Sequence, residues 1–113
     1  GLINLDLMDL RAIVEQDGKS TLLVGMGDPD EPEKILESAM MAPLAALDVG
    51  GATGCLIQIE GGLGMTLSQV DTVARLFTNA LDSDAQVILG ARVSDDLHNS
   101  MRVVTLLSGI SDG

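Results

Sequence analysis

Apolar side chains recur along the 113-residue chain with two kinds of spacing. A spacing of three or four residues, typical of an amphipathic helix, is found over residues 5–16, after Asp30 and over residues 67–81. Short apolar runs of strand length lie at residues 20–27, 54–62, 85–93 and 101–109. This order of helices and strands predicts an α/β fold, with a four-stranded mixed β-sheet and packed helices, preceded by a loop and a helix.

Residues at the ends of the predicted helices indicate where each helix begins. Asp30 is expected to be the N-cap of the second helix, with Glu33 three residues later, and Thr66 is expected to cap the third. The glycine cluster at residues 61–65 joins a strand to this third helix, and we expect its glycines to serve a turn with positive φ. The cluster has no lysine and lacks the glycine spacing of a phosphate-binding loop, which disfavours a phosphate site there.

The net charge of the chain limits the classes of molecule that it can bind. Asp and Glu number 17 against 6 Lys and Arg, a formal net charge of -11, while 46% of the residues are hydrophobic. This balance predicts a folded acidic domain that repels the phosphates of nucleic acids and anionic lipids, so we expect no nucleic-acid binding and no direct membrane binding. Lysine occurs only at Lys19 and Lys34. Such a composition suits a salt-rich cytoplasm, where screening weakens repulsion among carboxylates, although an ordinary acidic domain is the alternative.

Other features of the sequence bear on the length of the full protein, its redox compartment and membrane spanning. It begins at Gly1 without an initiator methionine, so we expect it to be part of a longer protein. The single cysteine, Cys55, cannot form an internal disulfide, which agrees with a reducing cytoplasm. The apolar runs are too short for a transmembrane helix.

Several short motifs suggest chemistry that their surroundings disfavour. GKST at residues 18–21 resembles the end of a P-loop, but Ile13 stands where that loop needs glycine, and the predicted helix and strand have the reverse order. The acidic residues at 28–33 lack the glycine and the distal glutamate of a calcium loop, and helix capping explains them. Cys55 and His98 have no visible catalytic partner. We therefore predict no metal site and no cofactor-binding residue in this chain itself.

The opening segment GLINLDLMDLRAIV places Asn4, Asp6 and Asp9 among apolar residues at the start of the first predicted helix. In a structural interpretation, Asn4 or Asp6 caps the helix, and both carboxylates favour the positive end of the helix dipole. In a functional interpretation, the two carboxylates lie three residues apart on one side of a helix, beside an amide, and orient a water molecule. The residues by themselves leave both interpretations open.

The same segment resembles the loop and helix that open the C-terminal domain of FtsZ, the tubulin-related division GTPase, where the pattern is close to G-x-x-N-x-D-x-x-D. The resemblance continues in order through LLVGMG, APLAALDVGGATGCLIQIEGG, MTLSQVDTVARLF, DAQVILGARVSDDL and MRVVTLLSG. The resemblance covers essentially the whole chain. The segment DAQVILGARVSDDL is more similar to archaeal than to bacterial sequences of the family. Residues 1–113 are thus similar to an FtsZ C-terminal domain, with the synergy (catalytic) loop and its helix at 1–16.

The resemblance implies a GTPase that polymerises head to tail and shares each active site between two subunits. Asp6 and Asp9 would orient and polarise the attacking water in the site of the neighbouring subunit, and Asn4 would hydrogen-bond at the same interface. GTP and Mg²⁺ would be bound by an N-terminal domain that this sequence lacks, so the fragment alone is expected to be inactive. The resemblance also implies other cell-division proteins as partners and a cytoplasmic location at the septal division ring. The competing hypothesis is a non-enzymatic α/β interaction or structural domain, in which the Asn/Asp cluster only caps a helix.

Overall fold

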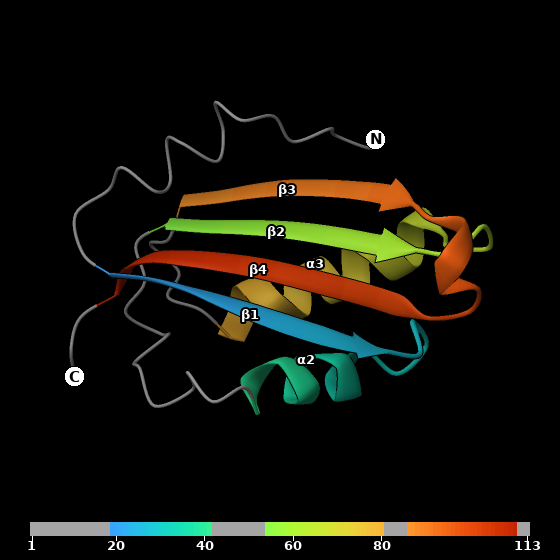
Figure 1. The fold of residues 1–113 in the computed structure, drawn as a ribbon, viewed down its shortest axis with the longest axis horizontal. Coiled ribbons are helices and arrows are strands. Elements are labelled where there is room, and N and C mark those ends of the chain that lie inside the picture. The colour runs from blue at the N-terminus through green and yellow to red at the C-terminus, as the bar shows by residue number, and fades with distance from the viewer. Residues whose placement is uncertain (1–18, 42–53, 81–85, 111–113) are drawn as a thin grey trace.

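The computed structural model describes residues 19–41, 54–80 and 86–110, and Figure 1 shows how their helices and strands are arranged. In chain order the elements are β1 (Lys19–Gly27), α2 (Pro32–Met40), β2 (Gly54–Gly61), α3 (Leu67–Ala80), β3 (Gln86–Val93), the 3-10 helix η3 (Asp95–Leu97) and β4 (Met101–Ile110). Each strand begins and ends within one residue of the run predicted from the apolar pattern. The helix predicted over residues 5–16 lies outside the described residues.

The four strands form one mixed sheet in the order β1-β4-β2-β3. β2 and β3 are parallel, because α3 carries the chain back along the sheet between them. The short η3 turn instead reverses the chain, so β4 runs antiparallel to β2 and also to β1. The predicted fold class, a four-stranded mixed sheet with packed helices, is confirmed.

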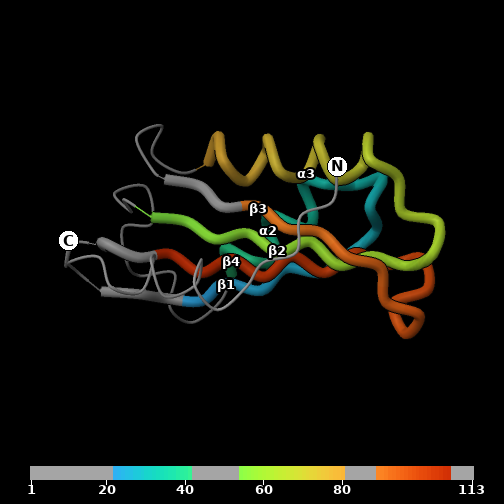
Figure 2. Tube along the Cα trace, turned by 90° about the horizontal axis from the view of Figure 1, so that it is seen from above, coloured from blue at the N-terminus to red at the C-terminus, as the bar shows by residue number. Residues whose placement is uncertain are grey.

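Both α-helices cover the same face of the sheet, and Figure 2 shows α3 running along that side. α2 buries Ile35 and Ala39 against the sheet. α3 buries the stripe of Val70, Val73, Ala74 and Phe77 that its sequence predicts. Between helices and sheet lies the core, whose strand residues include Leu23, Cys55, Ile57, Ile59, Ala91, Met101, Val103 and Leu107.

The close approach of α2 to β1 depends on Gly25. A Cβ at this position would collide with the carbonyl oxygen of Ile35 and would lie 3.0 Å from the Cβ of Ala39. Ser38 fastens the two elements, because its hydroxyl oxygen accepts a hydrogen bond from the backbone N–H of Met26 at 3.0 Å. A side chain at position 25 would therefore push α2 away from the sheet.

The helix starts confirm one predicted cap and correct the other. Thr66 caps α3 as expected, since the backbone N–H of Gln69 donates to Thr66 Oγ1 at 3.1 Å. The N–H of Thr66 also donates to Gln69 Oε1 at 2.9 Å, which completes a capping box. The prediction of Asp30 as the N-cap of α2 is wrong, since the N-cap is Glu31 and the helix begins at Pro32. Proline suits the first helical position because its fixed φ is already helical and it has no N–H to satisfy.

Candidate functional site

The three residues predicted to act in a shared active site lie before β1. Asn4, Asp6 and Asp9 fall outside the described residues, so their arrangement stays a prediction. Cys55 is fully buried in β2, and burial raises the pKa of its thiol to about 12. The thiol therefore stays protonated and packs as a small apolar side chain, as the sequence indicates. His98 is exposed in the turn after η3.

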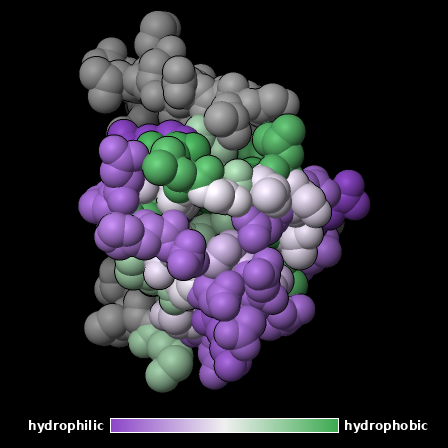
Figure 3. Space-filling model, turned by 90° about the vertical axis from the view of Figure 1, so that its right-hand side faces the viewer, coloured by the Kyte–Doolittle hydropathy of each residue, from purple (hydrophilic) through white to green (hydrophobic). Residues whose placement is uncertain are grey.

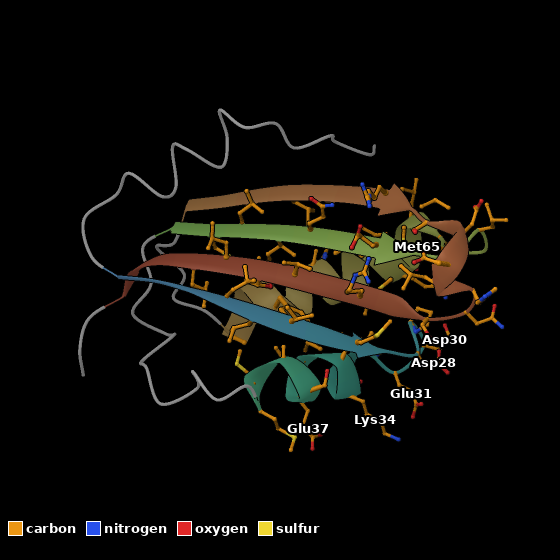
Figure 4. All side chains as sticks on the ribbon, in the orientation of Figure 1. Asp28, Asp30, Glu31, Lys34, Glu37 and Met65 are labelled. Atoms are coloured by element: carbon orange, nitrogen blue, oxygen red, sulfur yellow. The ribbon has the colours of Figure 1, made fainter. Side chains whose placement is uncertain are left out.

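Three loops meet at one end of the sheet around a cavity of about 250 Å³. Figure 3 faces this end of the molecule, where much of the surface is hydrophilic. Asp28 and Asp30 lie in the β1–α2 loop (Figure 4). Asp28 Oδ1 accepts a hydrogen bond from the backbone N–H of Asp30 at 2.9 Å, and Asp30 Oδ1 accepts one from Gln69 Nε2 at 3.0 Å. The lining consists of Asp28, Pro29, Asp30, Gly61, Gly62, Gly64, Met65, Gln69, His98, Asn99, Ser100 and Met101.

This lining suits a nucleotide phosphate poorly. Phosphate sites combine helix N-termini or backbone N–H groups with lysine or arginine. None of the described lining residues is a lysine or arginine, and two are aspartates that repel an anion. The residues described around the cavity therefore give no support to a GTP site within this part of the chain.

The glycines of the β2–α3 turn serve close packing. None of Gly61, Gly62 and Gly64 has a φ in the left-handed region, so the expectation of positive φ for them is wrong. A Cβ on Gly62 would overlap the carbonyl oxygen of His98, and a Cβ on Gly61 would collide with the Met65 side chain. The positive φ belongs to His98, at 51°. Glycine at position 62 is therefore needed for space, which lets the β2–α3 turn and the turn into β4 touch.

An ionic cluster spans β2, β3 and β4 on the face of the sheet away from α2 and α3. The sequence pattern did not predict it. Arg92 Nε donates to Glu60 Oε2 at 2.6 Å, and Arg102 Nε donates to Glu60 Oε1 at 2.8 Å. Burial acts to raise the pKa of Glu60, but the hydrogen bonds and charges of the two arginines outweigh it and leave the pKa below its ordinary value. The one sequence signal was an acidic residue inside an apolar strand, and only strand pairing reveals its partners.

The face of the sheet away from α2 and α3, called the outer face below, combines this cluster with exposed apolar side chains. Leu22, Val24 and Met26 of β1 are 49%, 46% and 49% exposed. Alternation along the strands places on this face Leu22, Val24, Met26, Leu56, Gln58, Glu60, Arg92, Arg102, Val104 and Leu106.

Residues 19–41, 54–80 and 86–110 bear on two further kinds of feature, a metal site and a membrane-spanning helix. No group of three or more His, Cys, Asp or Glu side chains in these ranges is placed to hold a metal ion. No helix within them is both long and apolar enough to cross a membrane.

The chain is similar to one family in sequence and in structure. The model described as the FtsZ family, C-terminal domain, matches residues 18–111. Cell division protein FtsZ 2 of Halobacterium salinarum is 37% identical over 110 residues, which make up 96% of this chain and 28% of that protein. An FtsZ dimer from M. jannaschii matches with a TM-score of 0.80 at 32% identity, over 96% of this chain and 32% of that one.

More distant structures share only the fold. A protofilament of CetZ2 from Haloferax volcanii, with GTPγS bound, has a TM-score of 0.66 at 16% identity, over 96% of this chain and 34% of that one. The chain spans less than a third of the curated relatives, 29% for the FtsZ of Methanothermobacter thermautotrophicus. The segment matched by the family model begins after Asn4, Asp6 and Asp9.

Proposed function

Because the chain belongs to the FtsZ family of cell-division proteins, we propose that it is the C-terminal domain of a tubulin-like GTPase that polymerises into filaments. In this proposal residues 1–113 form the domain, with the synergy loop and its helix at 1–16. GTP and Mg²⁺ bind to an N-terminal domain outside these residues. The match of the C-terminal-domain model to residues 18–111 is the observation that carries the proposal.

The opening loop is proposed to complete the GTP-hydrolysis site of the adjacent subunit. Asp6 and Asp9 would orient the attacking water and polarise it, while a cation offsets their repulsion from the γ-phosphate. Asn4 would hydrogen-bond at the same interface. Two features support a shared site: the described cavity has no lysine or arginine among its lining residues, and a similar structure is described as an FtsZ dimer.

Self-association and location follow from the same proposal. Head-to-tail contact brings the opening loop of one subunit to the nucleotide of the next, so hydrolysis depends on polymerisation. The full-length protein would act in the cytoplasm, at the division ring of the septum, together with other cell-division proteins. Its acidic surface favours membrane attachment through such partners over direct contact with anionic lipids.

The decisive substitution is Asp9→Ala in the full-length protein. GTP binding should persist, because the proposed pocket lies in the other domain, while turnover should fall by about 10²- to 10⁴-fold with the loss of a water-orienting group. Binding is measured by titration with GTP and Mg²⁺, and turnover by phosphate release per polymerised subunit. A residue that only caps a helix predicts another result: about 1 kcal/mol of lost stability with normal turnover.

Mixing two inactive proteins tests whether the site is shared. One partner carries Asp9→Ala, and the other has an intact opening loop but a disabled nucleotide pocket. Contacts that join the intact pocket of the first to the intact loop of the second should recover part of the activity. A mixture that co-polymerises and stays inactive would refute the shared site without touching family membership.

A further inference from the structure

The cavity among the three loops, called the end cavity below, has walls that are fixed by contacts within the chain. Gln69 joins two of the loops, because its Nε2 donates to Asp30 Oδ1 at 3.0 Å while its Oε1 accepts the N–H of Thr66 at 2.9 Å. The third loop lies against the second, where the carbonyl oxygen of His98 leaves no room for a Cβ on Gly62. The folded chain by itself therefore gives the end cavity its shape.

The lining of the end cavity combines two carboxylates with two thioethers. Asp28 and Asp30 are exposed in the β1–α2 loop, whereas Met65 is partly buried and Met101 is fully buried. The volume of about 250 Å³ is below the ~300–1,000 Å³ that is typical of pockets for drug-sized ligands. The end cavity therefore suits one long side chain with an apolar stem and a cationic end.

Each of the two aspartates uses one carboxylate oxygen within the chain. Asp28 Oδ1 accepts the backbone N–H of Asp30 at 2.9 Å, and Asp30 Oδ1 accepts Gln69 Nε2 at 3.0 Å. The described residues provide no donor for either Oδ2 atom, so both can accept hydrogen bonds from outside. A guanidinium matches two such acceptors because its five N–H donors form a planar fork, whereas an ammonium is a compact and strongly hydrated charge.

The surface next to the end cavity is acidic as well, and Figure 3 shows hydrophilic residues over this end. Exposed carboxylates lie beside the lining residues in the chain at Glu31, Glu33, Asp95 and Asp96. Two basic residues close to these loops in sequence already have partners, since Lys34 pairs with Glu31 at 3.0 Å and Arg102 with Glu60 at 2.8 Å. The local field therefore favours the approach of a cationic group.

We propose that the end cavity binds an arginine side chain from a basic segment of another protein, with the guanidinium on Asp28 and Asp30 and the stem against Met65. Charge complementarity identifies this partner as a different protein, because a second copy of this chain brings 17 acidic residues against 6 basic ones. The interaction uses no residue of the opening loop, so it is separate from the proposed role of that loop in GTP hydrolysis.

Methionine methyl groups provide the probe for this proposal. Full-length protein labelled with ¹³C at the methionine methyls, kept unpolymerised with GDP and without Mg²⁺, is titrated by NMR with a blocked glycine peptide that contains one arginine. The Met65 signal should shift with increasing peptide, while Met41, which is 77% exposed on α2, should not. A lysine peptide should bind several-fold more weakly, and a citrulline peptide, which lacks the charge, should not bind. Equal shifts of Met65 and Met41, or no shift of Met65 at millimolar arginine peptide, overturn the proposal.

Substitution of the carboxylates separates a specific site from general attraction. Asp28→Asn and Asp30→Asn keep the oxygen that accepts the internal hydrogen bond, and each should weaken binding of the arginine peptide about tenfold. Glu37→Gln removes the same charge from α2 outside the lining (Figure 4) and should change binding by less than about twofold. Equal weakening by all three variants would mean that net charge alone attracts the peptide, which overturns the site. A Met65 shift caused by GTP and Mg²⁺ without peptide also overturns it, because the occupant is then another subunit.

Discussion

Leu22 and Leu23 are neighbours on β1, yet they belong to opposite faces of the sheet. Leu23 is 1% exposed under α2 and α3, whereas Leu22 is 49% exposed on the outer face. The covered face is apolar, dense and completed by the helices of this chain. The outer face is apolar along β1 but is covered by neither helix. The two faces therefore contribute differently: the covered face packs the core of the domain, whereas the outer face leaves apolar side chains of β1 about half exposed.

The charges divide in the same way. Ion pairs on the helices join neighbouring turns at exposed positions: Lys34 pairs with Glu31, and Arg75 with Asp71. Pairs of this kind contribute little to stability, because water and salt screen them. Glu60 instead joins β3 and β4 through β2, with its carboxylate almost fully buried. Removing one member of the Glu60 cluster is therefore the more informative test.

The largest expected effect is the difference in stability between Leu23→Ala and Leu22→Ala. Leu23→Ala should lower the free energy of unfolding by about 2–5 kcal/mol, because it leaves a cavity among packed side chains. Leu22→Ala removes the same atoms at a half-exposed position and should cost below about 1 kcal/mol. Urea unfolding of the 113-residue chain measures both. Similar losses for the two variants would contradict the division between a covered face that packs the core and an outer face that contributes little to stability.

Glu60→Gln should have an intermediate and pH-dependent effect. The folded pKa of Glu60 lies below its ordinary value of 4.5, so its stabilising contribution is complete above that value and is lost as the pH falls through the folded pKa. The variant should therefore be less stable near neutral pH, by about 1–2 kcal/mol for hydrogen bonds to a charged group, and match the parent at acid pH. Urea unfolding across a pH series measures this. The exposed α2 control, Glu37→Gln, should change stability by less than about 0.5 kcal/mol.

A difference between parent and Glu60→Gln that stays constant down to acid pH would mean that the cluster acts through packing and not through charge. A destabilisation by Glu37→Gln equal to that by Glu60→Gln would remove the contrast between buried and exposed carboxylates.

Much of the fold could be predicted because its signals are local. Strand runs in Ile, Leu and Val, the α3 stripe and the Thr66 cap each lie within one short segment, and the structure confirms them. Asp30 misled because capping rules favour it over Glu31, whereas Pro32 determines the first helical position. The prediction of positive φ for the glycines of the β2–α3 turn was wrong because Gly62 is needed for its close contact with His98, which lies far away in sequence.

The candidate sites also differ in whether their residues lie close together in the sequence. Asn4, Asp6 and Asp9 were found because they lie together in one segment, and their role stays a prediction. Glu60 has its partners 32 and 42 residues away, so only the register of β2 with β3 and β4 brings them together. Six methionines in a chain with one aromatic residue suggest from the sequence that methionine fills gaps in the core. Met101 does so, but Met26 is half exposed, because membership of a face depends on which side the helices cover.

The smallest expected effect is a gain in stability on the covered face. Thr105 is 1% exposed, and no described residue provides a hydrogen-bond partner for its hydroxyl. A buried hydroxyl without a partner opposes folding, so Thr105→Val, which keeps the shape, should raise the free energy of unfolding by about 1 kcal/mol. Thr78→Val on α3 is the matched control, because its hydroxyl donates to the Ala74 carbonyl at 3.0 Å, and loss of that bond should give no gain. Thermal and urea unfolding of both variants measure the difference. If Thr105→Val destabilises the domain, its hydroxyl has a partner among the residues beyond the described ranges, and the covered face is not purely apolar at its centre.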